Sequence, residues 1–187
     1  MTIAAVVLAA GGGRRFVAGP DAPHKLLAPF RGKTVVRWAV DAALGAALDE
    51  TVIVVGAVEI DPPASVTLLS NPRWSEGQAG SLAVAIDHAR WQGHAAVVVG
   101  LGDQPMVTAG AWRLVAAADN SPISVATYHG RRRNPVRLSS EVWDLLPATG
   151  DVGARQLIAD HPDFVEDVPC PGQPVDIDTA EDLRRWG

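Results

Sequence analysis

The first 25 residues constrain the fold more than any other part of the chain. An uninterrupted apolar run over residues 3–10 ends in Gly11, Gly12 and Gly13, arginines follow, and the segment closes on Lys25. Such a run bounded by glycines is typical of a strand buried inside a parallel sheet. The glycines let the backbone turn tightly and bring N–H groups close to a ligand, and the cations favour a polyphosphate. A turn with a solvated basic tip is the plainer interpretation of the same residues.

Neither of two well-known phosphate-binding motifs is present. A dinucleotide fingerprint requires Gly-x-Gly-x-x-Gly, but Phe16 occupies the place of the third glycine, and no acidic residue closes the next strand. A Walker loop requires Gly-Lys followed by Ser or Thr, whereas Lys25 lies between His24 and Leu26. If this glycine loop binds phosphate, it does so in another sequence context.

The composition suits one domain over residues 1–187 with a substantial core, because 48% of the residues are hydrophobic. No stretch approaches the roughly 20 apolar residues of a membrane span. A net charge of −5 argues against nucleic-acid binding, so we expect neither a membrane nor a nucleic acid as partner. Cys170 is the one cysteine, which excludes a disulfide framework and favours a cytoplasmic location.

Apolar runs alternate with helical patterns along most of the chain. The patterns predict strands at residues 3–10, 51–55, 66–69, 95–99 and 164–168, and helices at 34–48, 81–91, 108–118, 140–146, 152–159 and 180–186. Residues 124–128 and 135–138 suggest a hairpin around a turn at 130–134. This alternation predicts an α/β fold, a Rossmann-like, mostly parallel sheet with helices on both faces.

Carboxylates lie where such a sheet binds ligands, at the carboxyl ends of its strands. Asp103 follows a buried strand and could hold Mg²⁺ beside a phosphate, although an ordinary Asp turn has the same pattern. Asp176 and Asp178 offer a second acidic site, with Ile177 between them turned inward. The alternative is that this segment caps the last helix. Residues 131–133, all arginine, are either a solvated hairpin tip or a contact for an anionic substrate group.

Five motifs, in order, extend over nearly the whole chain: Leu8-Ala9-Ala10-Gly11-x-x-x-Arg15 with Lys25-Leu26-Leu27, Asn71-Pro72-x-Trp74-x-x-Gly77-x-x-x-Ser81-Leu82, Gly102-Asp103-Gln104-Pro105, Gly150-Asp151-x-Gly153-Ala154-Arg155, and Asp176-Ile177-Asp178-Thr179-Ala180-Glu181-Asp182-Leu183. Together they resemble the signature of nucleotidyltransferases with a glycosyltransferase-A-like fold. Within these, the chain is most similar to the molybdenum-cofactor, or MobA-like, group. Leu-Ala-Ala-Gly, where guanylyl enzymes tend to carry Leu-Ala-Gly-Gly, favours its cytidylyltransferases.

The resemblance implies transfer of CMP from CTP to the phosphate of molybdopterin, with release of pyrophosphate. It also implies transient contact with a molybdoenzyme or its chaperone. One alternative is a guanylyl- or other nucleotidyltransferase acting on a small phosphorylated acceptor. From a different class comes a non-catalytic nucleotide-binding chaperone for the cofactor, which pyrophosphate release would distinguish from either enzyme.

The resemblance also assigns roles to residues. Arg15 and Lys25 would offset leaving-group charge, and Asp103 would hold Mg²⁺ together with Asp178 or Asp176. The nucleotide would be bound by Ala10, Gly11, Gly12, Gly13, Asn71, Gly80 and Ser81. One departure is the spacing of ten between Arg15 and Lys25, where relatives have about five. We expect the longer loop, residues 16–23, to be mobile without nucleotide, and Arg14 to share the role of Arg15.

Overall fold

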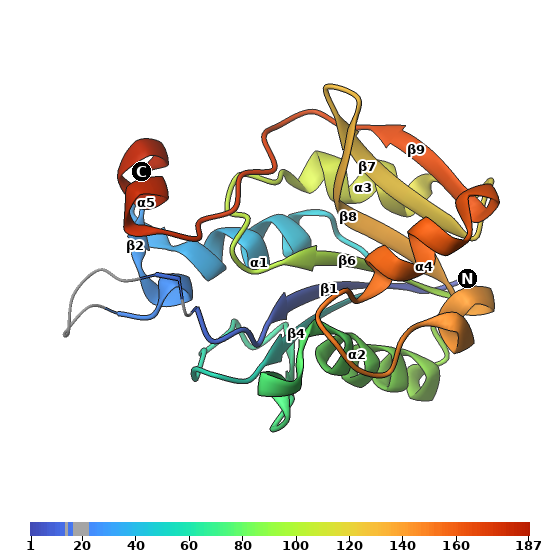
Figure 1. The fold of residues 1–187 in the computed structure, drawn as a ribbon, viewed down its shortest axis with the longest axis horizontal. Coiled ribbons are helices and arrows are strands. Elements are labelled where there is room, and N and C mark those ends of the chain that lie inside the picture. Colours follow the sequence, from blue (N-terminus) through green and yellow to red (C-terminus); the bar gives the residue numbers. More distant parts are fainter. Residues whose placement is uncertain (14, 17–22) are drawn as a thin grey trace.

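A seven-stranded sheet forms the centre of the fold, in the order β5-β4-β1-β6-β8-β7-β9 (Figure 1). The computed structural model describes residues 1–13, 15–16 and 23–187. Within this sheet, as far as the described residues show it, β8 alone runs antiparallel to both of its neighbours, so the predicted mostly parallel sheet is confirmed. The strands are β1 (Ile3–Ala9), β4 (Glu50–Val55), β5 (Thr67–Ser70), β6 (Ala96–Leu101), β7 (Ile123–Tyr128), β8 (Arg131–Ser139) and β9 (Val165–Pro169).

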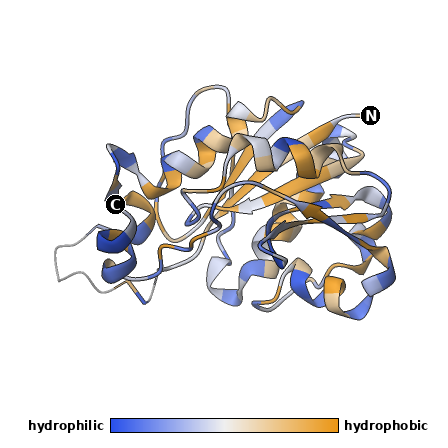
Figure 2. Ribbon diagram, turned by 90° about the horizontal axis from the view of Figure 1, so that it is seen from above, coloured by the Kyte–Doolittle hydropathy of each residue, from blue (hydrophilic) through white to orange (hydrophobic). Residues whose placement is uncertain are grey.

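Helices cover both faces of the sheet, because the alternating side chains of the buried strands point to opposite sides. Along β1, Ala5 and Val7 pack with α1 (Val35–Gly45) and α3 (Ala109–Ala117). Ala4 and Val6 pack instead with α2 (Gln78–Gln92), with the 3-10 helix η3 (Ser140–Leu145) and with α4 (Ala154–Asp160). Figure 2 shows that apolar residues are concentrated on the strands, whereas the helices carry both apolar and polar segments. None of the helices in the described residues is long and apolar enough to cross a membrane.

A third, smaller apolar cluster joins the end of the chain to the segment after Lys25. Phe30 and Val35 are buried in it with Ile177, and Leu183 and Trp186 of α5 (Ala180–Trp186) pack against them. The segment contains the 3-10 helix η1 (Lys25–Leu27) and a two-stranded ribbon, β2 (Pro29–Phe30) with β3 (Lys33–Thr34), which the sequence patterns did not predict. This cluster fixes the C-terminal helix beside Lys25.

The predicted turn at residues 130–134 is wrong in extent. His129 and Gly130 both have positive φ, as a two-residue hairpin turn requires, and β8 begins at Arg131. The arginines at residues 131–133 are therefore part of the strand pairing and lie opposite residues 126–128 of β7. Arg132 donates from Nε to Asp167 Oδ1 on β9 at 2.6 Å. The run is an exposed strand end rather than a loop tip.

At the opposite end of the sheet from the strand carboxyl ends, Glu50 gathers a polar cluster that no sequence motif indicated. Its Oε1 accepts from Thr67 Oγ1 at 2.7 Å and lies 2.9 Å from His88 Nε2, while Oε2 lies 2.7 Å from His94 Nε2. Burial alone would raise the pKa of Glu50, but the hydrogen bonds from Thr67, His94 and His88 outweigh it and lower the pKa below its ordinary value of 4.5.

We expect Glu50→Gln to reduce the free energy of unfolding at pH 7 by about 1 to 3 kcal/mol, because buried hydrogen bonds to a charged group are lost. A lowered carboxyl pKa contributes stability above pH 4.5 that disappears as the pH falls through the lowered value. The difference from wild type should therefore shrink below pH 4.5. Urea unfolding between pH 3 and 8 measures it, with the exposed Glu141→Gln as control. A difference that is constant over this range would contradict the assignment.

Candidate active site

The loops after β1 and β6 meet at the carboxyl ends of these neighbouring parallel strands, where Gly102 N donates to Leu8 O at 2.9 Å. They open onto a cavity of about 440 Å³. Its lining includes seven of the residues that the sequence assigned to the site: Gly11, Gly12, Gly13, Arg15, Lys25, Ser81 and Asp103. The glycine loop and the strand-end carboxylate are thus brought together as predicted.

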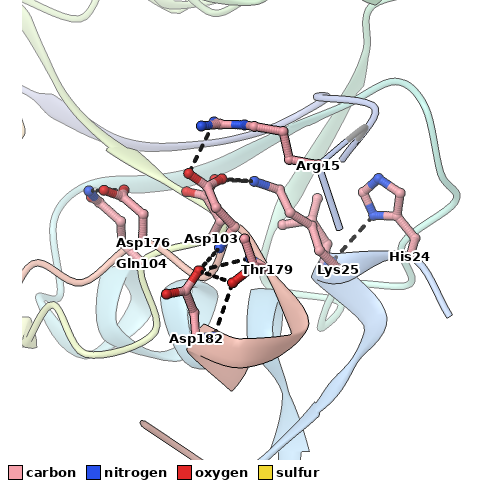
Figure 3. Close-up of polar contacts among 10 residues, drawn as sticks. Arg15, His24, Lys25, Asp103, Gln104, Asp176, Thr179 and Asp182 are labelled. Atoms are coloured by element: carbon pink, nitrogen blue, oxygen red, sulfur yellow. Dashed lines mark hydrogen bonds and ion pairs between the residues drawn. The ribbon is translucent and has the colours of Figure 1, made fainter. Parts of the chain in front are cut away.

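Lys25 lies between two carboxylates at the edge of this cavity. Its Nζ donates to Asp103 Oδ2 at 2.6 Å and to Asp178 Oδ1 at 2.9 Å, and Arg15 Nη2 lies 3.0 Å from Asp178 Oδ2. Figure 3 shows Lys25 extended toward Asp103. The Lys25 side chain is only 11% exposed, whereas Arg15 is 78% exposed. The ammonium is therefore shielded from water, and the guanidinium remains available to a ligand.

Asp178 reaches this place because the chain passes directly beside Asp103. Ile177 is fully buried and its N–H donates to Asp103 O at 2.9 Å, which confirms the inward orientation predicted for it. Thr179 caps α5 by accepting from Asp182 N, and Asp182 in turn accepts from Thr179 N. Since Thr179 is the cap, the Asp178 carboxylate is left to face Lys25.

Asp176 has a different partner. Its Oδ1 accepts from Gln104 Nε2 at 2.8 Å, and Figure 3 shows the pair to one side of Lys25. Burial raises the pKa of Asp176, and the negative charges of Asp103 and Asp178 raise it further, against the opposing effect of Gln104. Of the two acidic residues in the motif, the geometry therefore favours Asp178 over Asp176 as a cation ligand.

The Lys25 amine stays protonated, and therefore positively charged, at neutral pH. Burial alone would lower the pKa of this amine, but Asp103 and Asp178 outweigh that effect and raise it above its ordinary value of 10.5. The position of its ammonium, within 2.9 Å of two carboxylate oxygens, is a place where a cation is stabilised.

The same carboxylates suit a hard divalent cation. Asp103 Oδ1 is buried and has no hydrogen-bond partner among the described residues, so it has a lone pair available to a ligand. The described residues contain no group of three or more His, Cys, Asp or Glu that could enclose a metal by themselves. Mg²⁺ in nucleotide sites typically takes one or two carboxylates and completes its shell with phosphate oxygens and water. Two carboxylates at an open cavity fit that pattern.

Three predicted nucleotide-binding residues do not line the cavity. Asn71 is buried, donates from Nδ2 to Ser81 Oγ at 3.0 Å and accepts from Arg73 N, so it orients Ser81. Gly80 packs near the Asn71 amide, and Ala10 is buried against Gly56. Arg14 and residues 17–22, which carry the predictions about a shared arginine role and a mobile loop, lie outside the described residues.

Some lining residues were quoted in motifs but received no role from the sequence. Asp151 enters the cavity because its segment touches the start of α2, where Ala79 N donates to Gly150 O at 2.9 Å. Gly77 is required there, since a Cβ on it would lie 2.4 Å from Gly150 O. The signal was present in the Gly150-Asp151 motif. Trp74, the one tryptophan whose place in a motif made it a candidate for the site, also lines the cavity, as do Ser75 and Gln78 at unspecified positions of the same motif.

Comparison with known proteins identifies the family of this chain. The family model for the MobA-like NTP transferase domain matches residues 5–165. Nicotine blue oxidoreductase from Paenarthrobacter nicotinovorans is 30% identical, covering 98% of this chain and 95% of the relative. A solved Methanothermobacter nucleotidyl transferase, Mth528, is 26% identical, with a TM-score of 0.83 over 98% of this chain and 95% of that one. Mycobacterium tuberculosis Rv0371c, solved in complex with manganese, is 27% identical, with a TM-score of 0.77 over 100% and 98% of the two chains.

Proposed function

Since the chain belongs to the MobA-like NTP transferase family, we propose that it transfers CMP from CTP to the phosphate of a molybdopterin-type cofactor and releases pyrophosphate, with Mg²⁺. The observation that carries the proposal is the buried Lys25 between Asp103 and Asp178, at a cavity lined by the glycine loop. Such a site gathers the groups that phosphoryl chemistry needs, namely cations, backbone amides and carboxylates.

The chain's own residues would act by positioning and charge. A terminal phosphate oxygen of the acceptor forms a bond to the α-phosphorus as the bond to the leaving pyrophosphate breaks, and pyrophosphate takes the electron pair. This oxygen is already ionised near neutral pH, so no general base is required. Gly11, Gly12 and Gly13 would offer N–H groups to the phosphates. Arg15 and Lys25 would neutralise the charge that builds on the leaving group.

A divalent cation fits the carboxylates of the site. Asp103 and Asp178 would hold it, and Asp176 is the weaker choice because Gln104 already binds its Oδ1. When bound, Mg²⁺ would supply electrostatic stabilisation of the phosphate oxygens. The manganese in Rv0371c supports a divalent ion in a related protein.

Three motifs that resemble those of cytidylyltransferases in the molybdenum-cofactor group support CTP, namely Leu8-Ala9-Ala10-Gly11, Gly102-Asp103-Gln104-Pro105 and the Gly150 to Arg155 motif. Because Ala10 packs against Gly56, residue 10 would influence the base through the loop backbone rather than by direct contact. Delivery of the product implies transient contact with a molybdoenzyme or its chaperone.

The proposal is tested by a screen of CTP, GTP, ATP and UTP against molybdopterin and simple sugar 1-phosphates, scored by pyrophosphate release with Mg²⁺. We expect the highest kcat/KM for CTP with molybdopterin, and no release without an acceptor. A preference for GTP would assign the guanylyl alternative, and a preference for a sugar phosphate would replace the acceptor. Tight nucleotide binding without pyrophosphate release for any pair would indicate the chaperone.

A further inference from the structure

Trp74 packs directly against the glycine loop. A Cβ on Gly12 would lie 2.7 Å from Trp74 Cζ3, and a Cβ on Gly56 would lie 2.5 Å from Trp74 Cβ. Contacts this short mean that the Trp74 side chain fills the space that a side chain would need, with its ring at residue 12 and with its Cβ at residue 56. Trp74 is itself fixed at the start of a 3-10 turn, where its N–H donates to Asn71 O at 3.2 Å. The Trp74 ring therefore packs against the glycine loop and also lines the cavity.

His24 contacts the next residue of the same loop. Gly13 has φ +58°, and a Cβ on it would lie 2.8 Å from His24 Nε2. On its other side, His24 Nδ1 accepts from Leu26 N at 3.3 Å (Figure 3), and His24 O accepts from Leu27 N at 2.8 Å. His24 thus caps η1, the turn that carries Lys25, while its ring touches the glycine loop. One side chain links the two elements that would grip a triphosphate.

The ring of His24 is suited to this link because it is neutral. Burial lowers the pKa of the imidazole, and the carbonyl of Gly12 offsets this only in part. A neutral ring that accepts at Nδ1 carries its proton on Nε2, the buried atom that faces Gly13 and has no hydrogen-bond partner among the described residues.

Three successive glycines make a loop whose ordering is costly in conformational entropy. A loop that is already held in place when the nucleotide arrives does not incur that cost on binding, so contacts that preorganise it increase affinity. We infer that Trp74 and His24 are positioning residues that hold the glycine loop ready for the phosphates. The inference rests on the proposed function only in taking the loop as the phosphate-binding element.

The test measures the Kd of the nucleotide that wild type binds most tightly among CTP, GTP, ATP and UTP, by calorimetry with Mg²⁺. His24→Ala and Trp74→Ala should each raise Kd by about tenfold, a loss of about 1.4 kcal/mol. Both should raise KM similarly, and in Trp74→Ala, which leaves the cap of the turn that carries Lys25 unchanged, kcat at saturation should change less than about threefold. His24→Asn should recover part of the loss, because an Asn side chain can accept from the N–H two residues on. Trp91→Ala, at a ring that is 81% exposed, is the matched control.

A second measurement isolates the contact. Gly12→Ala should weaken binding in wild type, because the new methyl group meets the indole, but should cost clearly less in the Trp74→Ala background. Unchanged Kd in the single variants, equal losses in Trp91→Ala, or additive effects of Gly12→Ala and Trp74→Ala would each overturn the inference. If wild type itself binds none of the four nucleotides, it is the proposed function that fails.

Discussion

Asp103→Asn is expected to lower pyrophosphate release by about a thousandfold, because loss of one preorganised group that stabilises transition-state charge costs about two to three orders of magnitude in other enzymes, and a cation would lose one of its two proposed carboxylates. The variant keeps the shape of the side chain but removes the negative charge that faces Lys25, and it replaces one of the two carboxylate oxygens with an NH2 group that cannot bind a cation. Lys25 retains Asp178 at 2.9 Å, so the fold should persist. Pyrophosphate release and thermal unfolding, measured on the same preparation, check both statements.

The matched control is Asp41→Asn. Like Asp103, whose side chain is 19% exposed and paired with Lys25, Asp41 is a partly buried carboxylate, 25% exposed and paired with Lys33. It lies on α1, away from the cavity lining, so the variant should retain wild-type activity. More than a tenth of wild-type activity in Asp103→Asn with an unchanged melting temperature would remove Asp103 from the site.

Lys25→Met is expected to change two quantities in opposite directions. Pyrophosphate release should fall by about a hundredfold or more, because the leaving group loses its buried cation. The affinity for Mn²⁺ without nucleotide should rise by about tenfold, because the ammonium no longer competes for the two carboxylates. Activity assays and titration of free Mn²⁺ by electron paramagnetic resonance measure the two effects separately. Lys33→Met, whose ammonium pairs with Asp41, should change neither.

The pH dependence adds a further check on Lys25. Its raised pKa means that its contribution to stability is present below pH 10.5 and is lost as the pH rises through the raised value. The stability difference between wild type and Lys25→Met should therefore be constant from pH 7 to 9 and should shrink above 10.5. A decrease already near neutral pH, or weaker Mn²⁺ binding by the variant, would show that Lys25 does not occupy the cation position.

The central strands and helices could be predicted because the spacing of apolar residues along the chain indicates which of their side chains are buried. The predicted strand at 51–55 corresponds to β4, and Thr108 caps α3 with its side chain accepting from Ala111 N. The observed ends of an element differ from the predicted ones where contacts with residues distant in the sequence set them. The structure begins α2 at Gln78 rather than Ser81, because Gly150 O accepts the N–H of Ala79.

The sequence predicted most residues of the candidate site, but it did not predict which of their side chains contact one another. Lys25 and Asp178 are 153 residues apart, and tertiary contacts such as that of the buried Ile177 beside Asp103 bring them together. Motif position alone did not distinguish Asp176 from Asp178, because the distinction depends on the partner, Gln104. For the same reason Asn71 carries a motif signal while supporting Ser81 from behind rather than facing the cavity.

Asp178 lies in a part of the chain that comes after the last strand of the sheet, so the sheet and the proposed site depend on different segments. The last strand of the sheet ends at Pro169, and the family match ends at residue 165, yet the second carboxylate on Lys25 comes later. A chain that stops at Cys170 would contain every strand of the sheet and the whole glycine loop, but its Lys25 would face Asp103 alone. Proteolytic trimming of the C-terminus is therefore expected to remove the second carboxylate of the proposed site together with α5, and synthesis of the chain completes the seven-stranded sheet before it completes that site.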